Sequence, residues 1–489
     1  MRVENHAVVS NSIKRIIGLS SCLMIFGLLL FGCATVGPDY TQPEVSTPQE
    51  WSGSQAGGVL AEAMDPEQLA NWWTTLNDPA LTSMVDRALA DNLDLRQAMA
   101  RVREARARRG IIQADRFPTI DSTGSVTVNR SSEETGSGTE RDLYRAGFDA
   151  GWELDLFGGV RRSVEAAGAE LEASKENLRD VMVSLLAEVA LNYVEVRLFQ
   201  TRLSIAEANL AAQEETYEIT KARYTSGLTS QLDVEQAKYN LEETRSQIPS
   251  LQIGLDQAGN RLAVLLGQNP GSLKGELAER TAIPVTPLEV AAGVPAEVLR
   301  RRPDVRRAER LLAAQTAKVG VATAELYPRF SLSGTIGLEA LSFGNLFSTG
   351  SRTYGIGPSF QWNIFDTGCI RQNIDVQNAL QEQALISYEA TVLTALADVE
   401  NALVAYAKEQ IRRQSLTEAS LAAGRAVELA QNRYTSGLID FQSVLNAQRA
   451  LLSLQDQLTL SEGAVTSNLI SLYKSLGGGW TSQEPALEN

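Results

Sequence analysis

Apolar residues recur along this chain with two periods, and each period occurs twice. From Tyr144 to Leu154, and again from Tyr354 to Ile364, apolar side chains alternate with polar residues or glycine. Such alternation is the pattern of a β-strand with one apolar face. Elsewhere, long stretches place an apolar residue at every seventh position, the pattern of helices that pack as coiled coils. The chain is therefore predicted to combine two strand regions with two regions of long helix.

Each alternating segment has a weaker partner earlier in its region, at Ile120–Val128 and at Phe330–Ala340. Polar or glycine-rich residues join the partners, as expected of β-hairpins. Two hairpins give four strands, which fit either a half-buried soluble sheet or a sheet in lipid. Trp152 and Trp362 stand at equivalent strand ends, where they fit an aromatic girdle at a membrane surface and so favour lipid.

The seven-residue period predicts long helices with a left-handed supercoil. One nearly unbroken pattern runs from Gly158 to Tyr224, which corresponds to a helix on the order of 100 Å long at about 1.5 Å per residue. A soluble coiled-coil rod would explain these helices but neither the strands nor the N-terminus. The heptad positions are Met182, Val189, Val196, Leu203, Leu210 and Tyr217 in one helix, and Val234, Leu241, Ile248, Leu255 and Leu262, matched by Val444, Leu451, Leu458, Val465 and Leu472, in two others.

The whole pattern is a duplication with an offset of 210 residues. Pro118 and Pro328 are separated by this offset, and so are Arg223–Leu228 and Arg433–Leu438, which both read Arg-Tyr-Thr-Ser-Gly-Leu. Each hexapeptide ends one long helical pattern and precedes another. Because glycine permits the positive φ of a helix end, each hexapeptide is predicted to form the turn of a helical hairpin.

A secretory signal opens the chain. Lys14 and Arg15 precede an apolar run from Ile16 to Phe31. The run leads into Leu-Phe-Gly-Cys33, which resembles a bacterial lipobox, where signal peptidase II cuts and the cysteine carries lipid. An ordinary signal with an incidental cysteine is the alternative. Because Ala34 rather than aspartate follows the cysteine, a lipoprotein of this type is expected at the outer membrane.

Composition argues against an enzyme. The only histidine, His6, falls within the signal, so the mature chain is expected to lack the usual proton shuttle near neutral pH and the commonest transition-metal ligand. No catalytic residue, metal site or cofactor is predicted. The formal net charge of −15 disfavours nucleic acid as a partner.

The strands predict an oligomer. After Cys33 the sequence shows no apolar run that we expect to form a transmembrane helix, so a membrane crossing would use the strands. Four strands cannot close a barrel, and open sheet edges are not tolerated in lipid. Two copies would give a barrel whose interior side chains fill it, whereas three copies would leave a lumen. A trimer is the simplest conducting assembly.

Three motifs carry a resemblance to a known family. They are Asn92–Arg96 (Asn-Leu-Asp-Leu-Arg), Leu299–Val305 (Leu-Arg-Arg-Arg-Pro-Asp-Val) followed by Ala308-Glu309, and the paired Arg-Tyr-x-x-Gly tips. Over nearly all of its mature length the chain resembles the TolC-like outer membrane factors, and among them the NodT/OprM-like lipoprotein channels of efflux systems. In physical terms, Pro303 and Asp304 suit the first turn of a helix.

The resemblance implies a mainly α fold with a β-barrel part. Each protomer would give four transmembrane strands and long coiled-coil helices to a trimeric α/β barrel in the outer membrane, which would extend into the periplasm and be anchored by lipid such as palmitate on Cys33. The expected segments are a lipoprotein signal peptide at 1–32, a lipid-anchored segment at 33–77, repeat 1 at 78–267 with strands in 116–157, an equatorial linker at 268–295, repeat 2 at 296–476 with strands in 327–365, and a C-terminal tail at 477–489.

The resemblance also implies a docking site and a gate at the helical tips. A periplasmic adaptor that connects to an inner-membrane pump would dock there and open the tunnel. The family often reads Leu-Asp-Ala-Gln-Arg beyond the second tip, with the aspartate at the constriction, whereas this chain has Asn446 at that position. Asp440 would either supply an acidic ring instead or simply start a helix. The predicted adaptor contacts are Arg223, Tyr224, Gly227, Leu228, Arg433, Tyr434, Gly437 and Leu438, and the possible gate residues are Asp440, Gln442, Asn446 and Arg449.

The function implied by the resemblance is that of the passive exit duct of a tripartite efflux pump. Such a duct conducts drugs and other toxic small molecules across the periplasm and the outer membrane, and so contributes to multidrug resistance. The exit duct of a type I protein secretion system would look much the same and is the alternative, although the lipobox favours efflux. The sequence does not identify the substrates, the pump and adaptor, or the resting state of the tunnel.

Overall fold

The computed structural model describes residues 35–44, 48–51, 59–60, 65–284, 290–291 and 295–480. The predicted signal peptide, Cys33 and most of the predicted C-terminal tail lie outside these residues. Within them the duplication is confirmed, because equivalent helices begin 210 residues apart and have equal lengths. The pairs are α4 (Leu93–Ala114) and α8 (Pro303–Ala324), α5 (Gly159–Thr225) and α9 (Cys369–Thr435), and α6 (Gln231–Leu265) and α10 (Phe441–Ser475).

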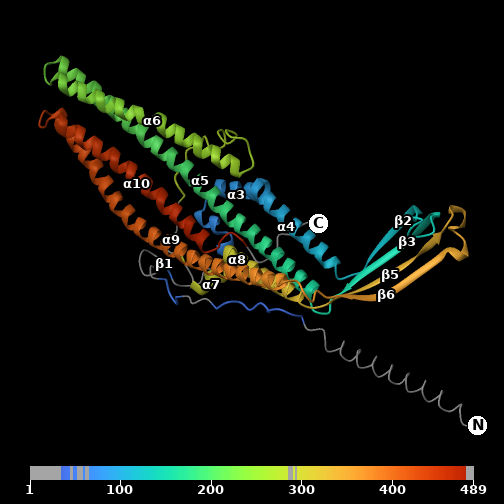
Figure 1. The fold of residues 1–489 in the computed structure, drawn as a ribbon. Coiled ribbons are helices and arrows are strands. Elements are labelled where there is room, and N and C mark those ends of the chain that lie inside the picture. Colours follow the sequence, from blue (N-terminus) through green and yellow to red (C-terminus); the bar gives the residue numbers. More distant parts are fainter. Residues whose placement is uncertain are drawn as a thin grey trace, which may run out of the picture. The chain divides into compact units, whose positions relative to one another are not determined.

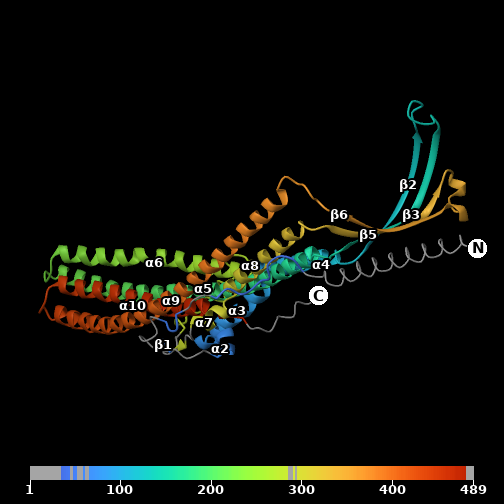
Figure 2. The same cartoon turned by 60° about the horizontal axis from the view of Figure 1, so that its bottom comes forward.

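Four antiparallel strands form the larger sheet, in the order β2-β3-β5-β6 (Figure 2). They are β2 (Thr119–Arg130), β3 (Glu140–Leu154), β5 (Arg329–Ala340) and β6 (Arg352–Gln361). The two predicted hairpins are therefore confirmed. The last strand is shorter than predicted, however, since it ends at Gln361, opposite Arg329. Pro328, which precedes Arg329, has no N–H to donate, so Trp362 and Ile364 lie beyond the ladder.

The register of the sheet gives it one apolar and one polar face. Phe148 lies opposite Ile336, which in turn lies opposite Tyr354. On the other face, Thr123 Oγ1 donates to Asp149 at 2.8 Å and Arg145 Nε donates to Glu339 at 2.9 Å. The apolar face is exposed to solvent in the single chain. Its large exposed side chains are Ile120, Val126, Val128, Phe148, Ile336, Tyr354, Ile356 and Phe360.

Shorter elements complete the described part of the chain. The strand β1 pairs in parallel with β4, which lies in the predicted linker. Pro303 begins α8 as predicted. The bounds are β1 (Val59–Leu60), α2 (Pro66–Ala70), η1 (Trp72–Leu76), α3 (Pro79–Asp91), β4 (Val290–Ala291), α7 (Pro295–Arg301), η2 (Phe343–Asn345) and η3 (Thr349–Ser351).

The chain divides into two compact units, and each unit takes segments from both repeats. The first unit comprises 1–43, 102–174 and 308–388 and holds the four-stranded sheet, and the second comprises 44–101, 175–307 and 389–489. The second unit holds α6, α10 and the greater part of α5 and α9, whose first turns belong to the first unit (Figure 1). The heptad pattern correctly predicts part of its core, since Val189, Val196, Leu262, Val465 and Leu472 are fully buried.

Helix α9 differs from one expectation. It contains a stretch that is long and apolar enough to cross a membrane, judged by length and composition only, although no such helix was predicted after Cys33. A helix packed in a coiled coil has a similar composition, so a single example is weak evidence for a membrane span. The exposed apolar face of the sheet is the stronger membrane signal.

Candidate functional site at the helical tips

The two hexapeptides form helical hairpin turns, as predicted. Gly227 has a φ of +72° and Gly437 a φ of +73°, a conformation that glycine adopts without strain. Leu228 N donates to the Arg223 carbonyl at 2.8 Å, and the equivalent Leu438 bond measures 2.9 Å. These bonds satisfy carbonyls at the helix end, which explains why the sequence turns here.

Although their sequences are identical, the two tips pack differently. The Tyr224 side chain is 43% exposed, whereas Tyr434 is only 5% exposed. Tyr434 packs against Phe441, with 5.5 Å between the ring centroids, in a cluster that also contains Ala237 and Val444. Tyr434 is therefore a packing residue in the single chain, and the ring of Tyr224 is exposed.

Arg223 joins the two tips. Its guanidinium lies over the ring of Tyr434, 4.8 Å from the centroid, and its Nη1 donates to the Thr435 carbonyl at 3.2 Å. Arg433, the equivalent residue of the second repeat, is exposed. One arginine thus holds the second turn, and the other is exposed, as Leu228 and Leu438 are.

The four possible gate residues fall into separate groups. Asp440 is the N-cap of α10 and accepts hydrogen bonds from Ser443, which hold the pKa of its carboxyl below the usual value. Gln442 Nε2 donates to Asn446 Oδ1 at 2.9 Å on the exposed surface. Asp440 thus has the helix-starting role that the sequence allowed. Position 446, where the family often has an aspartate, holds an uncharged amide bonded to Gln442.

Arg449 turns toward α6. Its Nε donates to Asn240 at 3.0 Å, its guanidinium lies 5.1 Å from the centre of the Tyr239 ring, and Glu243 is 3.8 Å away. The sequence analysis missed these partners. A signal for one of them existed, because Tyr239 and Arg449 are separated by the repeat offset of 210 residues. Equivalent positions of α6 and α10 therefore meet.

The predicted girdle residues are held alike at the ends of their strand regions. Trp152 Nε1 donates to the Arg116 carbonyl and Trp362 Nε1 to the Leu326 carbonyl, both at 3.0 Å. The two acceptor residues, Arg116 and Leu326, are also separated by the repeat offset of 210 residues. The two indoles are 37% and 50% exposed. Their polar atoms are thus satisfied while their rings stay accessible, the combination that suits a membrane interface.

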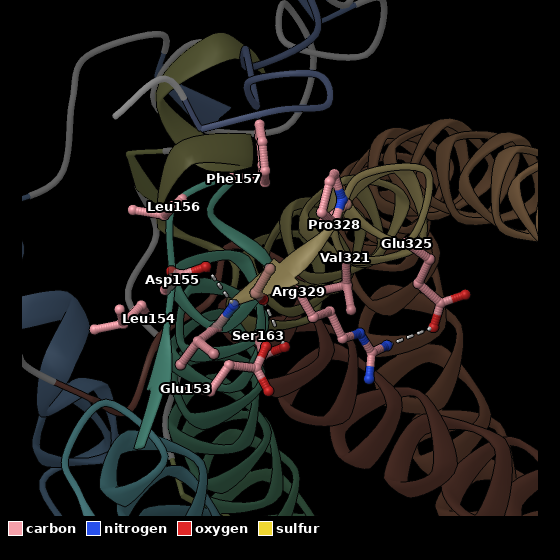
Figure 3. Close-up of a pocket in the computed structure, with 13 residues that line it drawn as sticks. Glu153, Leu154, Asp155, Leu156, Phe157, Ser163, Val321, Glu325, Pro328 and Arg329 are labelled. Atoms are coloured by element: carbon pink, nitrogen blue, oxygen red, sulfur yellow. Dashed lines mark hydrogen bonds and ion pairs between the residues drawn. The ribbon is translucent and has the colours of Figure 1, made fainter. Parts of the chain in front are cut away.

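A pocket lies where the strands pass into helices, and Figure 3 shows its lining residues. Asp155 accepts from the backbone N–H groups of Val160 and Arg161 at 3.2 and 2.9 Å, which caps α5. Arg329 forms an ion pair with Glu325 at 3.5 Å. These polar groups therefore have structural roles. Within the described ranges, no group of three or more His, Cys, Asp or Glu residues is placed to hold a metal ion.

The cap role of Asp440 predicts the effect of replacing it. Ser230 caps α6 at the equivalent position of the first repeat, so Asp440→Ser should leave thermal stability and transport at wild-type levels. Asp440→Ala should lower the unfolding temperature because it removes the cap. Circular dichroism in detergent and dye accumulation in cells measure the two properties. Loss of transport in a normally folded serine variant would instead assign a pore role to the Asp440 charge.

Comparison with known proteins places these features in a family. A family model described as outer membrane efflux protein matches residues 84–268 and 294–478. Nodulation protein T of Rhizobium leguminosarum bv. trifolii is 34% identical over 461 residues, which is 93% of this chain and 96% of that protein. Cation efflux system protein CusC of Escherichia coli O6:H1 is 32% identical over 470 residues, which is 94% of this chain and 100% of that protein.

Solved structures agree with these matches. The outer-membrane channel OprN is 38% identical and superposes with a TM-score of 0.87, covering 91% of this chain and 100% of that chain. The resemblance drawn from the sequence motifs is therefore confirmed over both repeats. This chain belongs to the outer membrane efflux protein family.

Proposed function

We propose that this protein is the outer-membrane exit duct of a tripartite efflux pump, through which small molecules leave the periplasm. The observation that carries the proposal is the two-faced sheet. Each strand of the four-stranded sheet contributes to an apolar face that is exposed in the single chain, while the opposite face is polar. A barrel strand in a membrane has these two faces, one toward lipid and one toward an aqueous lumen.

The active form is a homotrimer. Within the described residues, β2 and β6 each pair on one side only, and such edges are not tolerated in lipid. Three copies that join β6 of one protomer to β2 of the next would close a barrel wide enough for a lumen. Each copy would add two helices of 67 residues, each on the order of 100 Å long, as the wall of a periplasmic tunnel.

The partners are a periplasmic adaptor and, through it, an inner-membrane pump. The exposed side chains of the tips, above all Tyr224, Leu228 and Leu438, supply a surface for the adaptor. The duct itself performs no catalysis, and transport draws its energy from the pump. Lipid on Cys33 would add an anchor in the outer membrane, beside the girdle of Trp152 and Trp362.

Dye accumulation tests the function. Cells that lack this chain should accumulate several-fold more ethidium than cells that carry it, and the protein should fractionate with the outer membrane. A normally inserted Tyr224→Ala variant should behave like the deletion, whereas exposed Arg108→Ala on α4 should behave like wild type. Among the residues that the structure describes, Arg108 forms its ion pair with Glu104 alone, one turn away, so its loss controls for any surface substitution.

The other outcomes have distinct meanings. Unchanged dye accumulation with correct outer-membrane insertion would reject drug-type efflux, and loss of an exported protein from the medium would then favour type I secretion. A protein recovered in the soluble fraction would reject the barrel itself.

A further inference from the structure

The loop between β5 and β6 carries an apolar surface that the duct function leaves unexplained. It spans residues 341–351, at the end of these strands that is away from α8 (Figure 2). Leu341, Phe343 and Phe347 are 66%, 64% and 75% exposed. Large apolar side chains gathered on an exposed loop mark an interaction surface. We call this segment the aromatic loop.

The aromatic loop has a defined structure. It contains the 3₁₀ turns η2 and η3, in which Asn345 N and Leu346 N donate to the carbonyls of Ser342 and Phe343 at 3.1 and 3.2 Å. Ser351 Oγ donates to the Asn345 carbonyl at 2.5 Å, which ties the two turns together. Leu346 is buried. The loop therefore packs one large apolar residue inside and holds its phenylalanines outside.

The phenylalanine rings lie on the apolar side of the sheet. The Phe343 ring packs edge-on against Tyr144, with 5.9 Å between the centroids, and Phe347 packs edge-on against Phe343 at 6.4 Å. Tyr144 and Phe148 are four residues apart on β3, so their side chains point to the same face. Because that face is the exposed apolar face of the sheet, the aromatic loop extends the apolar face and does not cover the polar one.

The first repeat has an equivalent loop of opposite character. The residues 210 positions before Phe343 and Phe347 are Glu133 and Ser137. Both are exposed, and Glu133 forms an ion pair with Arg130 at 3.5 Å. A β-hairpin of this duplicated unit therefore does not need aromatic residues in its loop. One loop suits water, and the other suits an apolar environment.

The length of the strands places the aromatic loop at a membrane surface. Trp152, whose ring suits one interface, lies opposite Leu332 of β5, which in turn lies opposite Pro358 of β6. A barrel strand crosses the hydrocarbon core in about 9–11 residues. Counted from the level of Trp152, the opposite interface falls at residues 341–343 after β5 and at residues 347–349 before β6. Both ranges belong to the aromatic loop.

A basic residue follows the loop on the same face. Arg352 begins β6 opposite Leu338 and is exposed. It is two residues from Tyr354, so it also belongs to the apolar face. Among the described residues Arg352 has no ion-pair partner, and the equivalent residue of the first repeat is Asp142. An arginine at the edge of an apolar face can extend to the headgroups, where its guanidinium binds phosphate through two hydrogen bonds.

We propose that the aromatic loop docks in the outer leaflet of the membrane, where Phe343 and Phe347 enter the lipid and Arg352 binds the phosphate of a lipid headgroup. The loop is continuous with the apolar face, which favours lipid as its occupant. A neighbouring protomer would meet the sheet at β2 or β6, whereas Phe343 rests on Tyr144 of the inner strand β3. The proposal rests on the barrel of the proposed function.

Spin labels test the docking on the full-length protein in vesicles that contain lipid A. The label is attached at Phe347→Cys in a Cys369→Ser background, because Cys369 is a free exposed cysteine. Oxygen relaxes a label in lipid, and a nickel chelate relaxes a label in water. The ratio of oxygen to nickel relaxation should be several-fold higher at Phe347→Cys than at Ser137→Cys, the matched position of the polar loop. Adding Phe343→Ser should lower the ratio, because it removes the ring on which residue 347 rests.

A third label, at Ile336→Cys in the middle of the apolar face, separates this proposal from the proposed function. A water-exposed Ile336→Cys label would reject the barrel. A lipid-exposed label there, with equal ratios at Phe347→Cys and Ser137→Cys, would overturn the docking and leave the barrel intact. Low access of both reagents at Phe347→Cys would show contact with a neighbouring protomer and would also overturn the docking. If the Phe343→Ser protein does not insert, these comparisons still decide.

Mass spectrometry of the protein purified from cells tests the phosphate contact by counting the lipid A molecules that it retains. Arg352→Gln should retain at least about twofold fewer than wild type, because the charged hydrogen bonds to phosphate are lost. Arg141→Gln is the matched control. Arg141 is exposed and lies four residues from Arg145 of the polar face, so its loss should not change the number. Equal retention by the two variants would overturn the phosphate contact.

Discussion

Arg302→Ala should destabilise the protein by about 3–5 kcal/mol, the range for removing one partner of a buried ion pair. The Arg302 side chain is 10% exposed. It donates to both carboxylate oxygens of Asp304, to Asp398 at 3.0 Å, and to the carbonyls of Ala395 and Ser475 at 3.3 and 3.1 Å. One side chain thus links the start of α8 to α9 and to the end of α10, and its loss leaves the largely buried Asp304 carboxylate without its cation.

The pH dependence of the stability loss in Arg302→Ala shows whether the charge pair with Asp304 causes it. Burial would raise the pKa of Asp304, but the hydrogen bonds and charge of Arg302 outweigh burial and hold this pKa below its usual value. The ionised Asp304 therefore stabilises the fold above the unfolded pKa of about 3.9, and this contribution is lost as pH falls through the folded pKa. The difference between wild type and Arg302→Ala should be full at pH 7 and should shrink below about pH 4.

Arg300→Ala is the matched control, because Arg300 lies in the same run of three arginines but is exposed. It should change stability by less than about 0.5 kcal/mol. Denaturant titrations of the helical circular dichroism signal in detergent compare the proteins. A loss with Arg302→Ala that is equal at pH 7 and pH 3 would show that packing, rather than the charge pair, is responsible.

The spacing of apolar residues predicted the main strands and helices because this spacing is a property of each segment alone. Alternation identified the strands, and the seven-residue period located buried positions such as Val189 and Val465. Strand ends depended on a partner, however: the ladder stops at Gln361 because Pro328 precedes the paired residue on β5. Neither the alternation nor the tryptophan at position 362 contains that information, since pairing is a property of two segments.

The sequence predicted where the two helical tips lie along the chain but not how their side chains pack. Two identical hexapeptides suggested two equivalent tips, yet Tyr434 is buried and Tyr224 is exposed. The difference arises seven residues later, where α10 begins with Phe441 and α6 has Gln231 at the equivalent position. The aromatic residue gives Tyr434 a surface on which to pack.

The two tips share one hexapeptide sequence, so equivalent tyrosines provide a matched pair of variants. Tyr434→Ala should destabilise the tips by about 3 kcal/mol, since it removes a buried aromatic ring from Phe441 and the support beneath Arg223. Tyr224→Ala, in the same hexapeptide, should leave the fold stable because its ring is exposed. Hydrogen exchange of the amides near the ends of α9 and the start of α10 should accelerate more than tenfold in the first variant and remain unchanged in the second.

Tyr434→Phe separates the ring from its hydroxyl. The Tyr434 hydroxyl is buried with no hydrogen-bond partner among the described residues, and burial of an unpaired polar group costs free energy. The phenylalanine variant should therefore be as stable as wild type or slightly more stable. The packing of the tip helices is the two-state element that an adaptor would bias. If the Tyr434 ring holds the tips in one of these arrangements, Tyr434→Ala should loosen them. Channel conductance in planar bilayers should then rise. Exchange rates that change equally in Tyr224→Ala and Tyr434→Ala would contradict the asymmetry of the tips.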